Sequence, residues 1–218
     1  MIKKENVVSL LETKFIKVFD LQYAEGKHYF DATRNKAEDL VCVKSDEEFR
    51  KMSADAATCY VVIKTPGEEP KLLLHYEYRF PVGQYLLSVP AGLVDDCDKV
   101  LEDAVLVTAK REIKEETGID VKPSDRFFLI NPCVFSTPGM TDESNALVGA
   151  VITLDSLDAL REDGAVGGES FDGFSLVTKE EARKLLKQGT DGKGIFYPMF
   201  TWGALMWFVT DMWREEDD

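Results

Sequence analysis

The stretch 111–119 reads REIKEETGI and places three glutamates within five positions. A helix turns about 100° per residue, so Glu112, Glu115 and Glu116 fall on one face. Glu112 and Glu116 repel each other at this spacing by roughly 0.2–0.5 kcal/mol, and an Arg111–Glu115 pair offsets part of that cost. A bound cation would remove the conflict. The alternative, for these residues taken alone, is a solvated and charged helix face.

The composition limits the classes of function that the chain can serve. Its 218 residues are 44% hydrophobic, which is enough for a large core, and 40 acidic against 26 basic residues give a net charge of −14. Such a charge repels nucleic acids and acidic membrane surfaces. A small anionic substrate can still bind through metal ions and a few basic side chains. We therefore expect no nucleic-acid partner and no membrane partner.

The cysteines and the hydropathy pattern indicate a cytoplasmic protein. Cys42, Cys59, Cys97 and Cys133 are widely spaced and form no CxxC pair, which favours free thiols over a zinc site or a disulfide framework. No segment reaches about 18 uninterrupted apolar residues, and no apolar run follows the N-terminal lysines. We expect a soluble, untargeted chain.

The pattern along the chain predicts two parts. Residues 15–22 and 28–33 flank a turn and indicate a β-hairpin, which is marginal alone and must pack on something else, such as a second subunit. We assign 1–55 to an N-terminal β-rich extension that serves dimerisation, and 56–218 to the main domain with a C-terminal helix. A capping box at Ser45–Glu48 predicts a short helix in the extension.

The main domain is expected to contain a sheet and several helices. Its predicted strands are 59–63, 72–80, 85–89, 126–135, 146–154 and 174–177. A helix is predicted over about 99–117, with Gly118 as its C-cap residue. Thr178 begins a second capped helix, and 200–213 shows mixed helical spacing typical of a core or subunit contact.

From Gly92 to Ile119 the chain resembles the Nudix hydrolases, whose box reads G-x5-E-x7-R-E-U-x-E-E-x-G-U, with U a bulky aliphatic residue. The second half matches at every defined position. The flanks resemble the ADP-ribose pyrophosphatase branch. These flanks are 78–83 (YRFPVG), 90–95 (PAGLVD) and 136–143 (STPGMTDE).

The first half of the box departs from this pattern. Arg111 follows Gly92 by nineteen positions, which is longer than the spacing in the pattern and indicates an insertion around 97–104. Counting back from Arg111 gives Asp103 at the position of the first box glutamate, with Glu102 beside it. Either could serve as the outer metal ligand. Ser88 also stands where this branch often has an acidic residue.

The resemblance implies a metal site built from the helix and the strand before it. It implies the backbone carbonyl of Ala91, Glu112 and Glu116 as ligands, with Glu115 and Asp103 as further ones. Arg111 is implied to orient Glu115. Magnesium, or manganese in its place, suits such a set because it takes few carboxylates together with substrate phosphates.

The resemblance also implies a catalytic base and substrate contacts outside the box. Glu143 matches the base that deprotonates the attacking water, with Asp142 as a nearby substitute. Arg79 would hold the diphosphate or a ribose phosphate, with a surface ion pair as the alternative. Gly139 and Met140 would approach the ribose. Tyr23, Tyr29 and Phe30 lie on the predicted hairpin. Each could stack on adenine or pack against other protein side chains.

The implied fold is an α/β (α+β) protein, a Nudix α/β/α sandwich around a mixed sheet with an N-terminal β-rich extension. The implied function is metal-dependent hydrolysis of ADP-ribose, or of a similar nucleoside diphosphate sugar, by a homodimer. The alternatives are a Nudix hydrolase for another nucleotide sugar and a non-catalytic nucleotide-sugar sensor. His28 and His75 are interpreted as structural histidines.

Overall fold

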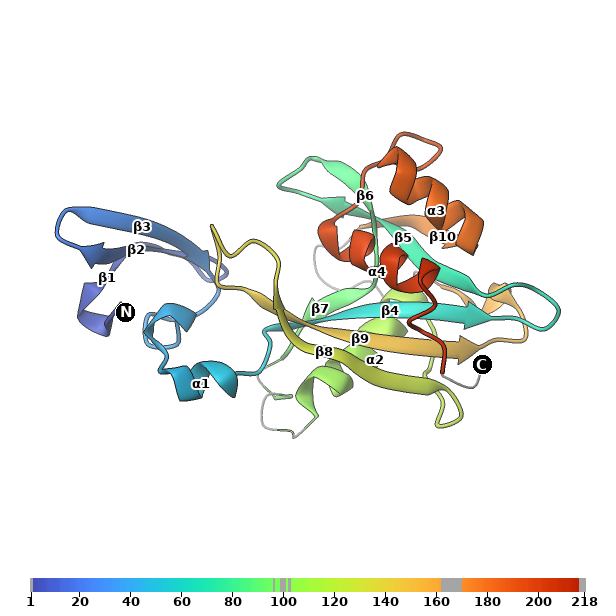
Figure 1. The fold of residues 1–218 in the computed structure, drawn as a ribbon, viewed down its shortest axis with the longest axis horizontal. Coiled ribbons are helices and arrows are strands. Elements are labelled where there is room, and N and C mark those ends of the chain that lie inside the picture. The colour runs from blue at the N-terminus through green and yellow to red at the C-terminus, as the bar shows by residue number, and fades with distance from the viewer. Residues whose placement is uncertain (1, 96, 99–100, 102, 162–169, 216–218) are drawn as a thin grey trace. The chain divides into compact units, whose positions relative to one another are not determined.

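The computed structural model describes residues 2–95, 97–98, 101, 103–161 and 170–215 (Figure 1). The chain divides into two compact units. The N-terminal unit consists of Met1–Asp55 and Cys133–Asn145, and the main unit consists of Ala56–Pro132 and Ala146–Asp218. Each unit has its own hydrophobic core.

The main unit is organised around a mixed sheet. The strand order is β10-β5-β4-β9-β8, with β6 paired to β5 and β7 paired to β4. The pairs that β5 forms with β4, β6 and β10 are antiparallel, whereas Figure 1 draws β4 and β9 with their arrowheads at the same end. The strands are β4 (Ala56–Lys64), β5 (Lys71–Arg79), β6 (Gln84–Ser88), β7 (Ala91–Leu93), β8 (Arg126–Phe135), β9 (Ser144–Thr153) and β10 (Phe171–Val177).

The central strand β4 is buried on both faces because its alternate side chains enter two different cores. Tyr60 and Val62 pack in a core that includes residues of α4, whereas Cys59 and Val61 pack in a core that includes residues of α2. Helices therefore cover both faces of the sheet, and the predicted sandwich is confirmed. These helices are α2 (Ala104–Thr117), α3 (Lys179–Gln188) and α4 (Met199–Val209), and a short 3-10 helix covers Leu157–Ala159.

The helix ends follow the capping residues in the sequence. Thr178 accepts a hydrogen bond from the backbone of Glu181 in the predicted capping box. Gly118 ends α2 in the left-handed conformation with φ of 75°, as expected for a C-cap glycine. The predicted helix start at about residue 99 falls partly on residues 99, 100 and 102, which lie outside the described residues. Leu101 lies in a bend, and the helix as described begins later than predicted, at Ala104.

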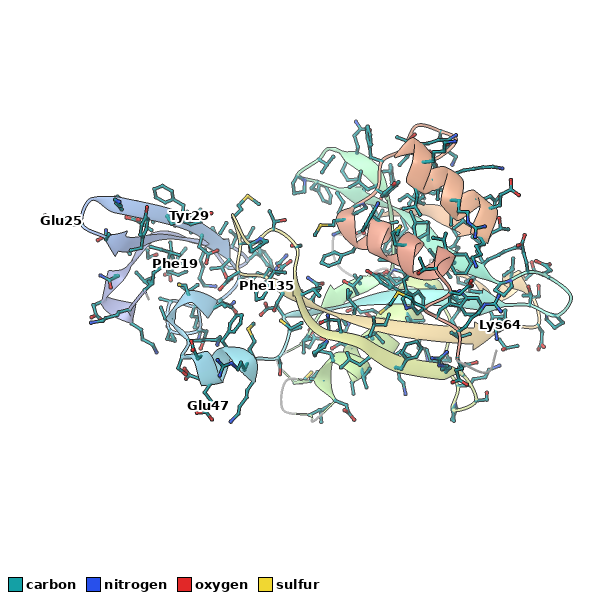
Figure 2. All side chains as sticks on the ribbon, in the orientation of Figure 1. Phe19, Glu25, Tyr29, Glu47, Lys64 and Phe135 are labelled. Atoms are coloured by element: carbon teal, nitrogen blue, oxygen red, sulfur yellow. The ribbon has the colours of Figure 1, made fainter. Side chains whose placement is uncertain are left out.

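The N-terminal unit is built on a three-stranded antiparallel sheet, β1-β2-β3. The predicted hairpin is confirmed as β2 (Lys17–Ala24) and β3 (Lys27–Thr33), whereas the sequence did not predict the edge strand β1 (Val7–Glu12). Phe19, labelled in Figure 2, forms a small core with Leu21 and Leu40. The unit also contains α1 (Asp46–Arg50) and 3-10 turns at Lys4–Asn6 and Val41–Val43.

Within the described part of the chain, none of the helices has the length and apolar character needed to cross a membrane.

Candidate active site

The glutamate face of α2 is largely buried. Glu112 and Glu116 keep only 5% and 3% of their surface exposed, whereas Glu115 is partly exposed. Ile113 is fully buried in the core that α2 forms with β4. Burying two carboxylates on one helix turn is costly unless positive charge or hydrogen-bond donors surround them. This face therefore requires charged or donating partners.

Arg111 gathers the carboxylates of this face around one guanidinium group. Its Nη1 atom lies 2.8 Å from Glu112 Oε1 and 3.0 Å from Glu115 Oε2. Its Nη2 atom lies 3.2 Å from Asp95 Oδ2 and donates to the carbonyl oxygen of Leu93 at 3.1 Å. Burial lowers the pKa of Arg111, but the surrounding carboxylates raise it by more, so the net shift is upward. One permanent cation thus faces three carboxylates.

Gly92 leaves the space that the carboxylate of Glu112 occupies. A Cβ atom at position 92 would lie 1.9 Å from Glu112 Oε1, so a larger residue would force the glutamate to move. The strand β7 holds this position by pairing Gly92 with Ala57 of β4. The backbone N of Ala91 lies 3.5 Å from Glu116 Oε1. Two carboxylates thus meet the backbone of β7, and hard oxygen ligands of this kind fit a divalent cation such as Mg²⁺.

His75 of β5 contacts the same face from the interior of the main unit. Its Nε2 atom lies 3.6 Å from Glu116 Oε2, and the side chain is completely buried. The ring stacks on Phe171 with 4.8 Å between the ring centroids. Burial, together with the charge of Arg79, lowers the pKa of His75 to about 3, although the backbone of Val89 acts in the opposite direction. The imidazole is therefore neutral near pH 7.

The other predicted residues of the main unit lie at the ends of secondary-structure elements. Arg79 ends β5, where its Nη2 atom pairs with Glu77 Oε2 at 2.7 Å while 44% of its side chain remains exposed. Asp103 is exposed at the N-cap position of α2 and makes no capping hydrogen bond there through its side chain. Glu102, its alternative as an outer ligand, lies outside the described residues.

The inserted segment before α2 contains a further acidic group that the sequence analysis did not single out. The group consists of Asp95, Cys97 and Asp98, and one possible ligand atom from each lies within 4.8 Å of the other two. Asp95 is already paired with Arg111, and Cys97 is exposed. The signal in the sequence is the run DDCD at 95–98. Its exposure and its ion pair account for the arrangement without a second metal.

Glu143, the predicted base, belongs to the N-terminal unit. Its Oε2 atom accepts a hydrogen bond from Arg34 Nε at 2.9 Å, and its side chain is 32% exposed. Its backbone N–H donates to Thr141 Oγ1 at 3.1 Å. The glutamates of α2 belong to the main unit, so the role of Glu143 stays a prediction.

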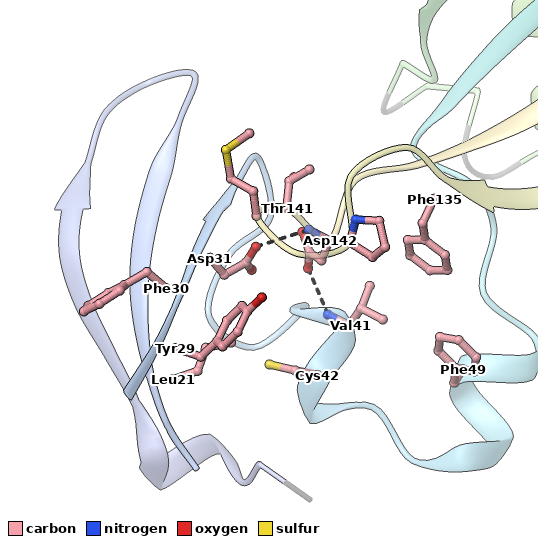
Figure 3. Close-up of a pocket in the computed structure, with 12 residues that line it drawn as sticks. Leu21, Tyr29, Phe30, Asp31, Val41, Cys42, Phe49, Phe135, Thr141 and Asp142 are labelled. Carbon is pink, nitrogen blue, oxygen red and sulfur yellow. Dashed lines mark hydrogen bonds between the residues drawn. The ribbon is translucent and has the colours of Figure 1, made fainter. Parts of the chain in front are cut away.

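Asp142 anchors the loop that carries Glu143. Its Oδ1 atom accepts from Thr33 Oγ1 at 2.6 Å, and its Oδ2 atom accepts from the N–H of Val41 at 3.0 Å. Its own N–H donates to Asp31 Oδ1 at 3.2 Å (Figure 3). Burial, together with the charge of Asp142, raises the pKa of Asp31 from 3.8 to about 6. This acidic pair was not predicted, because its members are 111 positions apart in the sequence.

A cavity of about 430 Å³ in the N-terminal unit adjoins this acidic pair (Figure 3). Its walls are mostly apolar and include Tyr29, Phe30 and Met140. Gly139 is not among the lining residues, but its carbonyl oxygen accepts a hydrogen bond from the hydroxyl of the lining residue Tyr29 at 2.9 Å. Tyr23 is 55% exposed and is not among the lining residues. The structure thus places Gly139 and Met140 beside an aromatic wall, with Tyr23 outside it.

Comparison with known proteins gives a match to a family profile and to named relatives. The sequence profile of the NUDIX domain matches residues 52–200. The chain is 26% identical over 140 residues to an ADP-sugar pyrophosphatase of Mus musculus, covering 64% of this chain and 60% of the mouse protein. It is 34% identical over 82 residues to an ADP-ribose pyrophosphatase of Saccharomyces cerevisiae, covering 38% of this chain and 32% of the yeast protein.

Structural comparison gives the same fold. The chain matches the crystal structure of an ADP compounds hydrolase with a TM-score of 0.50 and 17% sequence identity, covering 95% of this chain and 91% of that one. At this identity the match concerns the fold alone. The chain spans about a third to three fifths of the length of the two curated relatives above.

Proposed function

Because the chain belongs to the Nudix family, we propose that it hydrolyses the diphosphate bond of ADP-ribose or a similar nucleoside diphosphate sugar. The products would be a nucleoside monophosphate and a sugar phosphate. The observation that carries this proposal is the buried glutamate face of α2, where two carboxylates and Arg111 meet the backbone of β7. The named relatives that act on ADP-sugar and ADP-ribose support the substrate class.

The residues of this face would hold Mg²⁺, or Mn²⁺ in its place. Glu112 and Glu116 would be the principal ligands together with the carbonyl oxygen of Ala91, and Glu115 would complete the set. Asp103 stays a candidate outer ligand. When bound, a divalent cation neutralises phosphate charge and lowers the pKa of a water that can attack phosphorus. Nudix proteins generally use such a cation.

Arg111 would position the carboxylates of this face. A guanidinium group is permanently charged and offers several donors in a fixed plane, so one side chain can position two carboxylates at once. Its contacts at 2.8 Å with Glu112 and 3.0 Å with Glu115 support this role. The same charge lowers the mutual repulsion of the glutamates before a cation binds.

Glu143 would take the proton from the attacking water. Its side chain is partly exposed and its known partner is one arginine, Arg34, so the carboxylate can exchange that contact for a proton donor. Asp142 is a poor substitute, because hydrogen bonds from Thr33 and Val41 already hold its two oxygens in place. In this proposal Asp142 fixes the loop and Glu143 acts as the catalytic base.

Several residues are candidates for contacts with the substrate. Arg79 offers a half-exposed guanidinium group to a phosphate, in competition with Glu77. Met140 and the backbone of Gly139 would face the ribose. Tyr23 would supply an exposed ring for stacking on adenine. The net charge of −14 gives no support to a nucleic acid as the substrate.

We also propose that the chain forms a homodimer through its N-terminal unit. The strand β1 lies at the edge of its sheet, and apolar side chains there are exposed. Such an edge readily pairs with another chain. The exposed side chains on β1 are Val8, Leu10 and Leu11, and Phe15 and Ile16 in the connection to β2 are exposed as well. Light scattering should give twice the chain mass for the wild type, and a monomer mass for it would refute the dimer.

One assay separates an enzyme from a non-catalytic nucleotide-sugar sensor. Nucleoside monophosphate released from ADP-ribose, ADP-glucose and a dinucleotide is measured by chromatography, with Mg²⁺ or with EDTA. We expect Mg²⁺-dependent release, fastest from one of the two ADP-sugars. Binding of ADP-ribose without turnover of any of the three would favour the sensor. Faster release from the dinucleotide would refute the proposed substrate class.

A further inference from the structure

His75 is positioned to act on Glu116. It lies in β5 with no exposed surface, and its Nε2 atom is 3.6 Å from Glu116 Oε2. Stacking on Phe171, with an angle of 25° between the ring planes, restricts the tilt of the imidazole. The sequence analysis interpreted this histidine as structural. Its contact with a carboxylate of the glutamate face gives it a more specific role.

Ser88 completes a buried polar row behind the glutamate face. The register of β5 and β6 pairs His75 with Ser88, and both residues are buried. Directly opposite residues of an antiparallel pair project their side chains to the same face of the sheet. Both ring nitrogens of His75 and the hydroxyl oxygen of Ser88 are buried. Among the described residues, none of these three atoms has a partner with good hydrogen-bond geometry. Buried polar groups of this kind are uncommon without a functional reason.

The donor and acceptor properties of His75, Glu116 and Ser88 favour one arrangement of protons. An imidazole with a single ring proton has one N–H donor and one acceptor nitrogen. An ionised carboxylate only accepts, whereas a serine hydroxyl can donate. The row is consistent if Nε2 of His75 carries the proton and Nδ1 accepts from Ser88. The competing arrangement has the ring proton directed to the backbone of Val89, which follows Ser88 and also acts on this ring.

We propose that His75 is a positioning residue for Glu116, with its Nε2–H directed at Glu116 Oε2 and its Nδ1 accepting from Ser88. This inference rests on the proposed function, in which Glu116 is a ligand of the divalent cation. The distance of 3.6 Å exceeds the usual range of about 2.7–3.2 Å for an N–H···O bond, so the carboxylate closes it by a shift of a few tenths of an ångström.

The consequence is a carboxylate that is held from both sides. The N–H of Ala91 approaches Oε1 of Glu116 at 3.5 Å, and His75 approaches Oε2. Fixing both oxygens sets the plane of the carboxylate before a cation arrives. Groups that orient a metal ligand in this way typically change metal affinity by about 10–100-fold when they are lost.

The first test determines which ring nitrogen of His75 carries the proton in the wild-type protein. The chain has two histidines, so a long-range ¹H–¹⁵N spectrum of protein labelled with ¹⁵N-histidine shows two rings only. His28→Gln assigns the signals, because it removes the ring on the exposed hairpin and leaves His75. We expect the ring proton of His75 on Nε2. A ring protonated at Nδ1 alone would overturn the proposal.

The second test uses a pair of matched substitutions. His75→Gln places an amide N–H near the position of Nε2, whereas the shorter side chain in His75→Asn cannot reach it. Binding of Mn²⁺ is measured by electron paramagnetic resonance, with folding checked by circular dichroism. We expect His75→Asn to weaken binding by about tenfold or more and His75→Gln to stay close to the wild type. Equal affinities in the two variants would overturn the proposal.

The two proposals fail in different ways. If wild-type protein does not bind Mn²⁺, or if Glu116→Gln binds it as well as the wild type does, then Glu116 is not a ligand and the proposed function fails. If Glu116 is required for binding while the ring carries its proton on Nδ1, only the role of His75 fails. The tautomer is read without metal, so this result does not depend on turnover.

Discussion

The two units of this protein each contain a cluster of acidic side chains, and the clusters are held by different partners. In the N-terminal unit, Asp142 accepts hydrogen bonds from a threonine hydroxyl and a backbone N–H, and its own N–H donates to Asp31. In the main unit, Glu112 and Glu115 share one nitrogen of Arg111. Neutral donors hold the first cluster, and a cation holds the second.

This difference separates a structural cluster from a functional one. Hydrogen bonds from neutral donors satisfy a carboxylate and fix a loop, but they leave no reason to bind a cation. A guanidinium group shared among several carboxylates lowers their repulsion only in part, and a divalent cation lowers it further. Substitutions in the main unit should therefore affect metal binding and turnover. Substitutions of Asp31 or Asp142 should affect stability.

The largest effect is expected for Glu116→Gln. This change keeps the size of the side chain and removes a charge from the glutamate face. Loss of a cation that supplies several kcal/mol of transition-state stabilisation corresponds to roughly a thousandfold fall in turnover. The measurement is kcat/KM with ADP-ribose and Mg²⁺, with the unfolding midpoint as a check on the fold.

Glu180→Gln provides the matched control for this change. Glu180 is exposed on α3, where it pairs with Lys184 at 2.8 Å, so the same substitution there should leave turnover unchanged. Near-normal rates in Glu116→Gln would mean that the metal ligands have been placed wrongly.

A smaller loss is expected for Gly92→Ala. The new Cβ would lie 1.9 Å from Glu112 Oε1, and the far end of the glutamate would have to move, which disturbs the metal site more than the fold. We expect Mn²⁺ affinity to fall about tenfold to a hundredfold, as for the loss of a group that orients a ligand. Gly192→Ala is the control, because no atom of the described residues lies within 4 Å of the Cβ that it would add. Equal Mn²⁺ affinity in the two alanine variants would show that the glutamate adapts freely.

The smallest effect is expected for Asp31→Asn, and it concerns stability and pH. Burial beside Asp142 raises the pKa of Asp31 in the folded protein to about 6, above its ordinary value of 3.8. Below about pH 4 the group is protonated in both the folded and the unfolded chain, so its contribution cancels. As pH rises from about 4 to 6, the unfolded chain releases the proton while folded Asp31 keeps it, so the wild type loses stability, and the loss is complete above about pH 6.

Asparagine cannot ionise, so Asp31→Asn should not lose this stability. The free energy of unfolding, measured by urea titration at pH 4, 5, 6 and 7, should favour the variant increasingly, by on the order of 2 kcal/mol at the upper end. Affinity for Mn²⁺ should stay at the wild-type value. A difference between the two proteins that does not change with pH would contradict the shifted pKa of Asp31.

The sequence predicted those features that depend on neighbouring residues. Gly118 ends α2 because a left-handed residue is needed there, and Ser45 and Thr178 begin helices through local capping boxes. The pairing of Arg111 with Glu115 follows from their spacing of four on a helix. The Nudix family and its fold followed from the box and its flanks.

Other features depend on contacts that no local pattern encodes. The strand β1 reads VVSLLE, which lacks the alternation of a half-buried strand, and its side chains are mostly exposed. The contact of His75 with Glu116 joins a strand to a helix across the main unit, and it cannot be found by spacing along the chain. The start of α2 was predicted too early because acidic and apolar residues in 99–103 continue the helical composition.

The composition of the N-terminal unit from two separate segments has a consequence for synthesis. Residues 1–55 leave the ribosome first, but the loop that Asp142 anchors against them belongs to 133–145. During translation Thr33 and Val41 must therefore wait for their hydrogen-bond acceptor Asp142 until much of the main unit has emerged. Truncation of residues 1–55 would remove the partners that hold the loop at Asp142.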